Sequence, residues 1–406
     1  MSEKPPTGRT APTGNGARNA LLLLLAFAGL VMVGFGALRL PIVLTRGYQI
    51  SVERSLFTAV NAATLTGFEQ SFASTGDYHP VGIATISVLM LGGAWITLSL
   101  ASMAVVRLMQ MGVSDGMVMG ATAAMIVVST LFGGAMIALE GRDLVESLFA
   151  AASMFTGSGL LIGAPPRVES PWLHVSWLPL AVLGSLGIPT LMELWRRLTR
   201  RKPLSRYSRL AVVLVAGAYL VGLLLLLATS WTQRVEWREA LANASACSIT
   251  ARMPGTPFSS PGEWSRPAQW VVIGLMLVGG MPASGAGGIS LITLAAIWKG
   301  LQRSFRNEVA GRAFAVAVTW SALFLLLSGV AVLLLLALQP QMPADRAIFM
   351  AISAIGCVGL SHDPVSTTGV GLHVLSGAML VGRLVPIAAL WYIAIREETV
   401  DALPNM

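Results

Sequence analysis

The sequence predicts an all-α membrane protein in which four repeats, each made of a span, a re-entrant pore loop and a second span, surround one central pore. Of the 406 residues 55% are hydrophobic and only 11% are charged, and the mean hydropathy is +0.72. A water-soluble domain of this size does not reach such values. Eight stretches hold the ~20 apolar residues that cross ~30 Å of hydrocarbon, so eight transmembrane helices are expected. A short amphipathic segment separates the two spans of each repeat.

The eight predicted spans are residues 20–43, 81–106, 117–139, 172–195, 210–230, 268–298, 313–338 and 370–395. In pairs they define repeat one over 20–107, repeat two over 117–196, repeat three over 210–298 and repeat four over 313–395. The remaining segments are a disordered cytoplasmic N-terminus at 1–19, two basic cytoplasmic loops at 197–209 and 299–312, and a cytoplasmic tail at 396–406.

Each short segment ends in a turn of small residues. The four copies read SLFTAVNAATLTGF, SLFAAASMFTGSGL, ALANASACSITARM and AIFMAISAIGCVGL. They place the turn positions 92, 92 and 108 residues apart, at Gly67, Gly159, Ala251 and Gly359. A helical part of about ten to thirteen residues is too short to cross a bilayer, so each segment enters and leaves from one side. Irregular backbone at that depth is tolerated only where it lines a cavity or is buried in protein.

Charge placement predicts the orientation. The formal net charge is +8, and the basic residues gather in two loops, at Arg196, Arg197, Arg200, Arg201, Lys202, Arg206 and Arg209 and at Lys299, Arg303, Arg306 and Arg312. The positive-inside rule puts these loops and both termini in the cytoplasm, so the four turns face outward from the cell inner membrane. Topology thus accounts for the basic balance: membrane lipids are the expected surroundings, and no nucleic acid is expected.

The turns have the chemistry of an ion filter. A dehydrated monovalent cation needs oxygen ligands in place of water, and rings of backbone carbonyls supply them. Glycine adopts the required backbone angles and leaves the lumen open. The candidate carbonyls belong to Leu65, Thr66 and Gly67; Gly157, Ser158 and Gly159; Ile249, Thr250 and Ala251; and Cys357, Val358 and Gly359. Small residues also allow tight helix packing, but four occurrences in matching register favour a pore.

At these motifs the chain resembles the Trk/Ktr/HKT superfamily of potassium transporters, over about residues 20–395. LMLGGAW at 89–95 and LGSLGIPTLMELW at 183–195 look like the first and second helices that follow the family's filter segments. The resemblance implies potassium uptake, with potassium as the transported ion and no cofactor. It also implies a homodimer on a cytoplasmic nucleotide-binding ring subunit, and the two basic loops are candidate docking surfaces. Sodium or non-selective monovalent cation translocation by the same fold is the alternative.

The sixth predicted span contains VGGMPASGAGGIS at 278–290, where five glycines and one proline interrupt a helical pattern. It is similar to the glycine-rich intramembrane loop that the superfamily uses as a gate. The resemblance implies gate residues at Gly279, Gly280, Ser284, Gly285, Gly287 and Gly288. A kinked span packed through small residues is the alternative.

Arg383 lies midway along the last predicted span, in a sequence, GRLVP, that resembles the family's matching helix. A charge at that depth disfavours insertion by at least ~2.5 kcal/mol, so Arg383 is expected to point inward toward carbonyl oxygens or water. Its predicted role is to latch the gate loop and to add an electrostatic barrier below the filter. Capping the carbonyls of a broken helix is the structural alternative.

The third segment departs from the family pattern. It has Ala251 in place of glycine, Arg252 next to it, and Ile249 where the family usually has arginine. Arg252 is expected to point behind the filter toward an acid such as Glu69 or Glu239. A register on Gly255 is the other possibility. The selectivity between potassium and sodium therefore stays open, and Ser290, where family members often have lysine, leaves regulation open as well.

Other functions fit the sequence poorly, and the chain is not expected to be an enzyme. An intramembrane serine hydrolase using Ser284 would need a base at similar depth, but the histidines fall in or near outer loops and the G-x-S-x-G motif is missing. A coupled symporter would show a buried carboxylate, whereas Glu193 sits beside a basic loop. Cys247 and Cys357 are expected to be packing residues, without a disulfide or a metal site.

Overall fold

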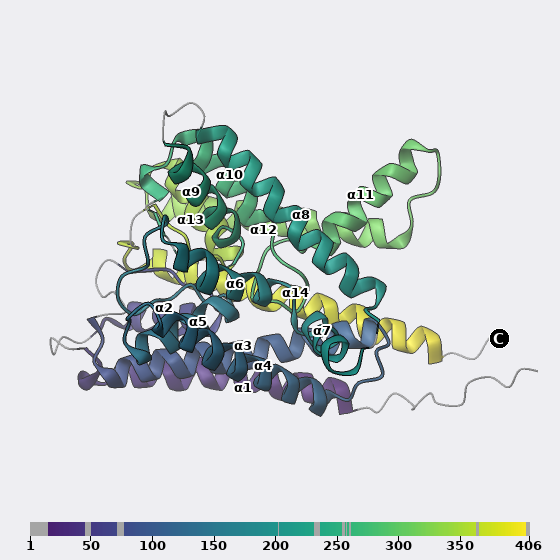
Figure 1. The fold of residues 1–406 in the computed structure, drawn as a ribbon, viewed down its shortest axis with the longest axis horizontal. Coiled ribbons are helices and arrows are strands. Elements are labelled where there is room, and N and C mark those ends of the chain that lie inside the picture. Colours follow the sequence, from purple (N-terminus) through teal and green to yellow (C-terminus); the bar gives the residue numbers. More distant parts are fainter. Residues whose placement is uncertain are drawn as a thin grey trace, which may run out of the picture.

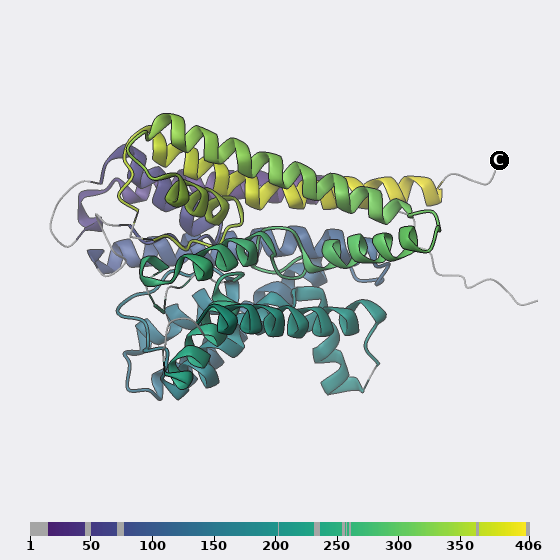
Figure 2. The same cartoon turned by 90° about the horizontal axis from the view of Figure 1, so that it is seen from above.

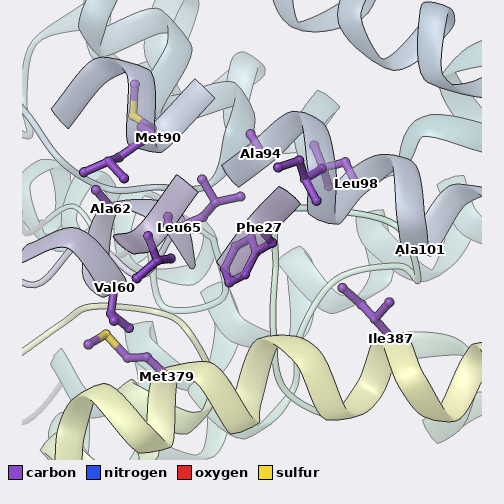
Figure 3. Close-up of a cluster of buried hydrophobic side chains, with 14 of the residues drawn as sticks. Phe27, Val60, Ala62, Leu65, Met90, Ala94, Leu98, Ala101, Met379 and Ile387 are labelled. Carbon is purple, nitrogen blue, oxygen red and sulfur yellow. The ribbon is translucent and has the colours of Figure 1, made fainter. Parts of the chain in front are cut away.

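The computed structural model describes residues 15–44, 50–70, 77–201, 203–230, 236–253, 256, 258–259, 261–362 and 365–402. Within these ranges the secondary structure is helical apart from isolated β-bridges such as the one between Gln70 and Val365. The predicted all-α class is therefore confirmed. Side chains from several repeats share one apolar core, in which Val60 and Leu65 lie close to Met90 and Met379 (Figure 3).

In the part of the chain that the structure describes, six long apolar helices have the length and composition to cross a membrane. They correspond to predicted spans one, two, three, five, seven and eight, and they are α1(Asn15–Leu38), α3(Pro80–Leu108), α4(Asp115–Ala138), α8(Arg206–Ser230), α12(Arg312–Leu338) and α14(Val370–Ala402). Helices α1, α3, α4 and α14 run along the long axis of the molecule (Figure 1). The chain is thus a multi-pass membrane protein. Helix α1 begins at Asn15, so residues 15–19, predicted to be disordered, are helical, and residues 1–14 lie outside the described ranges.

The other two predicted spans are not continuous helices. The fourth contains a π-helical turn (Leu173–Trp177), α6(Leu178–Ser185) and α7(Ile188–Arg200), with a bend of 109° between its two halves. The bend falls at Gly187, whose φ of +79° suits glycine. The sixth divides into α10(Arg266–Leu277) and α11(Leu291–Phe305) around the glycine-rich segment. Two of the eight predicted transmembrane helices are thus interrupted: the sixth by the run of helix breakers that the sequence analysis singled out, and the fourth by a left-handed glycine that it did not.

Four short helices occupy the predicted re-entrant positions: α2(Val52–Ala63), α5(Leu144–Thr156), α9(Trp237–Thr250) and α13(Ala344–Ile355). Each one packs between the two outer elements of its own repeat: α2 between α1 and α3, α5 between α4 and α6, α9 between α8 and α10, and α13 between α12 and α14. Ser51 and Asp143 cap α2 and α5 by accepting bonds from backbone N–H groups. Two 3₁₀ turns (Pro41–Val43 and Pro261–Glu263) complete the helices. Viewed from above (Figure 2), α12 runs beside α14, which it also contacts.

Candidate ion filter and gate

Three of the four turns share an unusual backbone conformation. Leu65 and Gly67 have φ values of +59° and +89°. The same alternation of left-handed residues occurs in repeat two, at Gly157 and Gly159, and in repeat four, at Cys357 and Gly359. A left-handed residue at every second position redirects successive peptide groups, so the chain leaves the short helix without continuing it. The predicted filter residues of these three repeats therefore lie in non-helical backbone.

The three glycine turns meet one another. An added Cβ on Gly67 would collide with the carbonyl oxygen of Ser158, and one on Gly359 would collide with the carbonyl oxygen of Thr66. Residues 91 and 293 positions apart along the chain thus place their backbones in direct contact. The turn of repeat one therefore contacts the turn of repeat two and the turn of repeat four. Only residues without a side chain permit this approach.

The third turn has a different backbone conformation. Ile249 and Thr250 are the last residues of α9, and Ala251 is right-handed, with a φ of −64°. The carbonyl of Ile249 accepts bonds from the N–H groups of Arg252 and Met253 at 3.1 Å, so it is not free to face an ion. Residues 249–251 therefore lie at the end of α9, without the alternating left-handed backbone of the other three turns, and their assignment to the filter stays a prediction. The alternative register on Gly255 lies outside the described residues.

Residues just after Ala251 do reach the second turn. The hydroxyl of Thr256 donates to the carbonyl of Gly159 at 3.3 Å, and an added Cβ on Gly157 would meet the side chain of Met253 at 2.8 Å. The third repeat therefore contacts the second turn through the segment that follows α9, and not through the end of the helix.

Asn61, which the sequence analysis did not single out, holds the first turn. Its Oδ1 accepts bonds from the N–H groups of Gly67 and Phe68, both at 2.9 Å, and its Nδ2 donates to the carbonyl of Phe68 at 2.9 Å. The side chain is 2% exposed. The aligned positions of repeats two and four are Ser153 and Ser353. The sequence therefore marked Asn61 only by an asparagine at a position where these two repeats have serine.

We expect Asn61→Ala to lower the stability of the protein and its discrimination between rubidium and sodium. The substitution leaves two buried N–H groups without a partner, at about 1–3 kcal/mol each. Thermal unfolding in detergent and isotope flux into vesicles measure the two effects. The control is Asn243→Ala in α9, because Asn243 Oδ1 has no hydrogen-bond partner within the described part of the chain. Equal behaviour of the two variants would contradict the role of Asn61.

Arg252 points away from the turns, as expected, but its partner is not an acid. Its guanidinium donates to the carbonyl of Ala218 in α8. The predicted pairing with Glu69 or Glu239 is therefore wrong. The bond to a carbonyl is favoured because the guanidinium lies beside the carbonyls of a neighbouring helix, whereas Glu69 and Glu239 are exposed.

We expect Arg252→Leu to lower the free energy of unfolding without changing ion selectivity. A hydrogen bond to a charged donor contributes about 1.5–3 kcal/mol, and the side chain reaches α8. Denaturation and competition flux assays test the two halves of this expectation, with the exposed Arg238→Leu in the same helix as control. A changed rubidium-to-sodium ratio would place the charge in the ion path after all.

The glycine-rich segment folds into a loop that is held by backbone hydrogen bonds at both ends and in its middle. Gly279 N–H donates to the carbonyl of Ile289 at 3.0 Å, and Ile289 N–H donates to the carbonyl of Leu277 at 2.9 Å. Farther along, Met281 N–H donates to Ser185, and Ile188 N–H donates to Ala283, at 3.0 and 3.1 Å. The loop is thus bonded to the break between α6 and α7.

The loop also lies against the turns at the point where the short helices stop. An added Cβ on Gly285 would collide with the carbonyl of Thr156, and one on Gly287 would collide with the carbonyl of Gly356. The hydroxyl of Ser284 is buried and has no hydrogen-bond partner among the described residues. A hydrolase reading of Ser284 therefore lacks the base that would activate it.

Arg383 joins the loop to the first turn. Its Nε donates to the carbonyl of Thr64 at 2.7 Å, and its Nη2 donates to the carbonyls of Gly285 and Leu65 at 2.8 and 3.4 Å. The side chain is 5% exposed. Three carbonyls from two segments thus solvate the charge, which is what an arginine inside a membrane requires. The structure therefore brings Arg383 and Gly285 together, as expected.

Glu69 follows the first turn, two residues after Gly67. Its carbonyl accepts a bond from Val365 N–H of repeat four at 2.8 Å. Partial desolvation raises the pKa of its carboxyl group above the ordinary value. Within the described residues, no group of three or more His, Cys, Asp or Glu could hold a metal ion, and Cys247 and Cys357 are both free thiols.

Comparisons with known proteins agree with this architecture, although no family model matches the sequence. The chain is 24% identical over 430 residues to Ktr system potassium uptake protein B of Vibrio alginolyticus, with 95% of this chain and 93% of that protein covered. It is 25% identical to the protein of the same name from Bacillus subtilis, with 95% of each covered. It is 24% identical to potassium/sodium uptake protein NtpJ of Enterococcus hirae, with 94% of each covered.

A solved structure shows the same fold. The crystal structure of the potassium transporter TrkH from Vibrio parahaemolyticus matches 92% of this chain and 84% of its own length, with a TM-score of 0.70 at 18% identity. In sequence and in fold the chain resembles the Trk/Ktr potassium transporters. The relatives are named as uptake proteins and the solved structure as a transporter, which agrees with the expectation that the chain is a transport protein and not an enzyme.

Proposed function

We propose that this chain is the pore subunit of a potassium uptake system in the cell inner membrane, with both termini in the cytoplasm. The observation that carries the proposal is the direct backbone contact of the turns, Gly67 with Ser158 and Gly359 with Thr66. Turns that meet in this way can offer several carbonyl oxygens to one dehydrated ion. An inside-negative potential contributes ~2.3 kcal/mol per charge per 100 mV, so inward flux needs no chemical step.

The loop at 278–290 serves as the gate. It lies against the inner end of the turns, and Arg383 bonds to the loop and to the first turn at once. A loop rich in glycine can rearrange its backbone with little steric penalty, so a closed and an open arrangement can be close in energy. The charge of Arg383 adds an electrostatic barrier to a cation that leaves the filter.

Transport of sodium, or of several monovalent cations, is the second candidate. It is favoured by the third repeat, where helical residues occupy the predicted filter position and the ring of glycine turns is incomplete within the described residues. One relative is itself named a potassium/sodium uptake protein. Fewer or displaced carbonyls weaken the discrimination between ions of different size.

Rubidium flux into proteoliposomes, with and without competing sodium, tests both candidates. Under an inside-negative potential we expect rubidium uptake that an equal sodium concentration leaves nearly unchanged. Strong competition by sodium would favour the second candidate. No uptake by correctly folded protein at any potential would overturn the pore itself.

A homodimer on a cytoplasmic nucleotide-binding ring is the proposed assembly. The basic residues at the end of α7 and in the connection between α11 and α12 are exposed, Arg200 and Arg303 among them, and can pair with an acidic face of the ring. Co-purification of a soluble partner with the wild-type chain, but not with a chain whose loops 197–209 and 299–312 are neutralised, is the expected result. Unchanged binding after neutralisation would refute this docking surface.

A further inference from the structure

A cavity of about 840 Å³ lies beside the gate loop. Its walls come from the loop, from α11, α12 and α14, and from Thr97 and Ala101 of α3. It extends well beyond the turns, because α12 is an outer helix of the fourth repeat. The ion path proposed above therefore does not account for its full extent.

The walls of the cavity are mainly apolar. Val316 and Leu323 of α12 line it while remaining 41% and 40% exposed, and Ile387 and Leu390 of α14 line it from the other side. Two arginines also contribute. Arg383 is already bonded to three carbonyls. Arg312, the first residue of α12, is exposed, so its charge is available to an occupant.

The depth of the cavity matches one leaflet. The α12 residues that line it extend from Arg312 to Leu323, a rise of about 16 Å along a helix. This is roughly half of the ~30 Å hydrocarbon core. Arg312 is close in sequence to Lys299 and Arg303 at the end of α11 and to Arg306 in the connection, and Glu308 is the one acid between residues 299 and 312. Such a cationic connection lies at the cytoplasmic surface.

We propose that this cavity binds an anionic phospholipid of the inner leaflet, with its phosphate at Arg312 and an acyl chain along α12 toward the gate loop. Basic pockets between transmembrane helices on the cytoplasmic side suit anionic head groups, and exposed apolar walls inside a bilayer suit hydrocarbon. The acyl chain reaches Gly287 and Gly288, which line the same cavity. The occupant thus touches the loop that the proposed function treats as the gate, although binding can be measured without any ion flux.

The first test counts bound lipid. The protein is reconstituted in phosphatidylcholine that contains increasing amounts of palmitoyl-oleoyl phosphatidylglycerol. Native mass spectrometry then measures how much phosphatidylglycerol stays bound to the protein at each amount. We expect Arg312→Gln to weaken retention about fivefold, which corresponds to the ~1 kcal/mol that a basic residue near the surface contributes. The matched control is Arg206→Gln, because Arg206 is the exposed first residue of α8 in repeat three and does not line the cavity. Equal losses in both variants, or equal retention of phosphatidylcholine, would overturn the proposal.

The second test locates the occupant and does not depend on Arg312. A photoreactive benzoylphenylalanine at Leu323 should attach to phosphatidylglycerol, and Val316→Trp, which fills the cavity, should abolish the adduct. Val213→Trp on the exposed face of α8 is the control and should leave it unchanged. Attachment to a second copy of the chain, or a lipid adduct that survives Val316→Trp, would show that lipid does not occupy the cavity.

Discussion

Rubidium flux falls more than about tenfold in Gly67→Ala and in Gly359→Ala, which corresponds to an added barrier of at least ~1.4 kcal/mol. Both glycines have φ values near +90°, at +89° and +87°, where a side chain is strained by about 1–3 kcal/mol. Each added Cβ would also collide with a carbonyl of the neighbouring repeat, Ser158 for Gly67 and Thr66 for Gly359. The turns must therefore separate, and the carbonyl positions change.

Uptake of radioactive rubidium into proteoliposomes measures this effect, with size-exclusion behaviour as the check on folding. Gly377→Ala is the matched control, because Gly377 lies in α14 of repeat four and its added Cβ would meet nothing within 4 Å. Wild-type flux through folded Gly67→Ala protein would mean that the ions take another path.

Replacing residues 279–288 by two glycines raises rubidium flux at least about tenfold, if the loop adds a barrier of ~1.4 kcal/mol or more. Val278 and Ile289, which pair as an isolated parallel bridge, mark the two ends of the segment that is replaced. It removes Gly285, one of the acceptors of Arg383, but keeps the bonds of that arginine to the first turn.

The same flux assay, run with and without the loop, provides the measurement. Combining the replacement with Gly67→Ala is the control: the double variant should lose flux again, since the ions would still need the turns. Loss of flux in the folded single variant would show that the loop supports the pore and does not close it.

Periodicity and composition were sufficient to predict most of the fold. Long apolar runs predicted the six continuous helices, and short segments ending in small residues predicted α2, α5, α9 and α13. The bend at Gly187 was also marked in the sequence, by glycine followed by Pro189, but an apolar run was taken as a straight helix. Apolar content reports the depth of a segment in the membrane, and it says little about the path of the backbone.

The third repeat shows why the site was harder to predict. Equal spacing selected Ala251, whereas α9 continues to Thr250 because no glycine stops it there. The partner of Arg252 was missed for a related reason: a backbone carbonyl of α8 has no signature in the sequence. Asn61 and Arg383 both bind carbonyls of the first turn, but only Arg383 stood out, because a charge in an apolar span is conspicuous and a neutral amide in a short helix is not.

The bonds between the glycine-rich loop and the break before α7 have a mechanical consequence. Ser185 and Ile188, on either side of the bend, are bonded to Met281 and Ala283. Helix α7 can therefore pivot at Gly187, and its N-terminal end is attached to the loop. A displacement of the arginine-rich far end of α7 would therefore be transmitted to the loop that lies against the turns, through these hydrogen bonds and the packing around them.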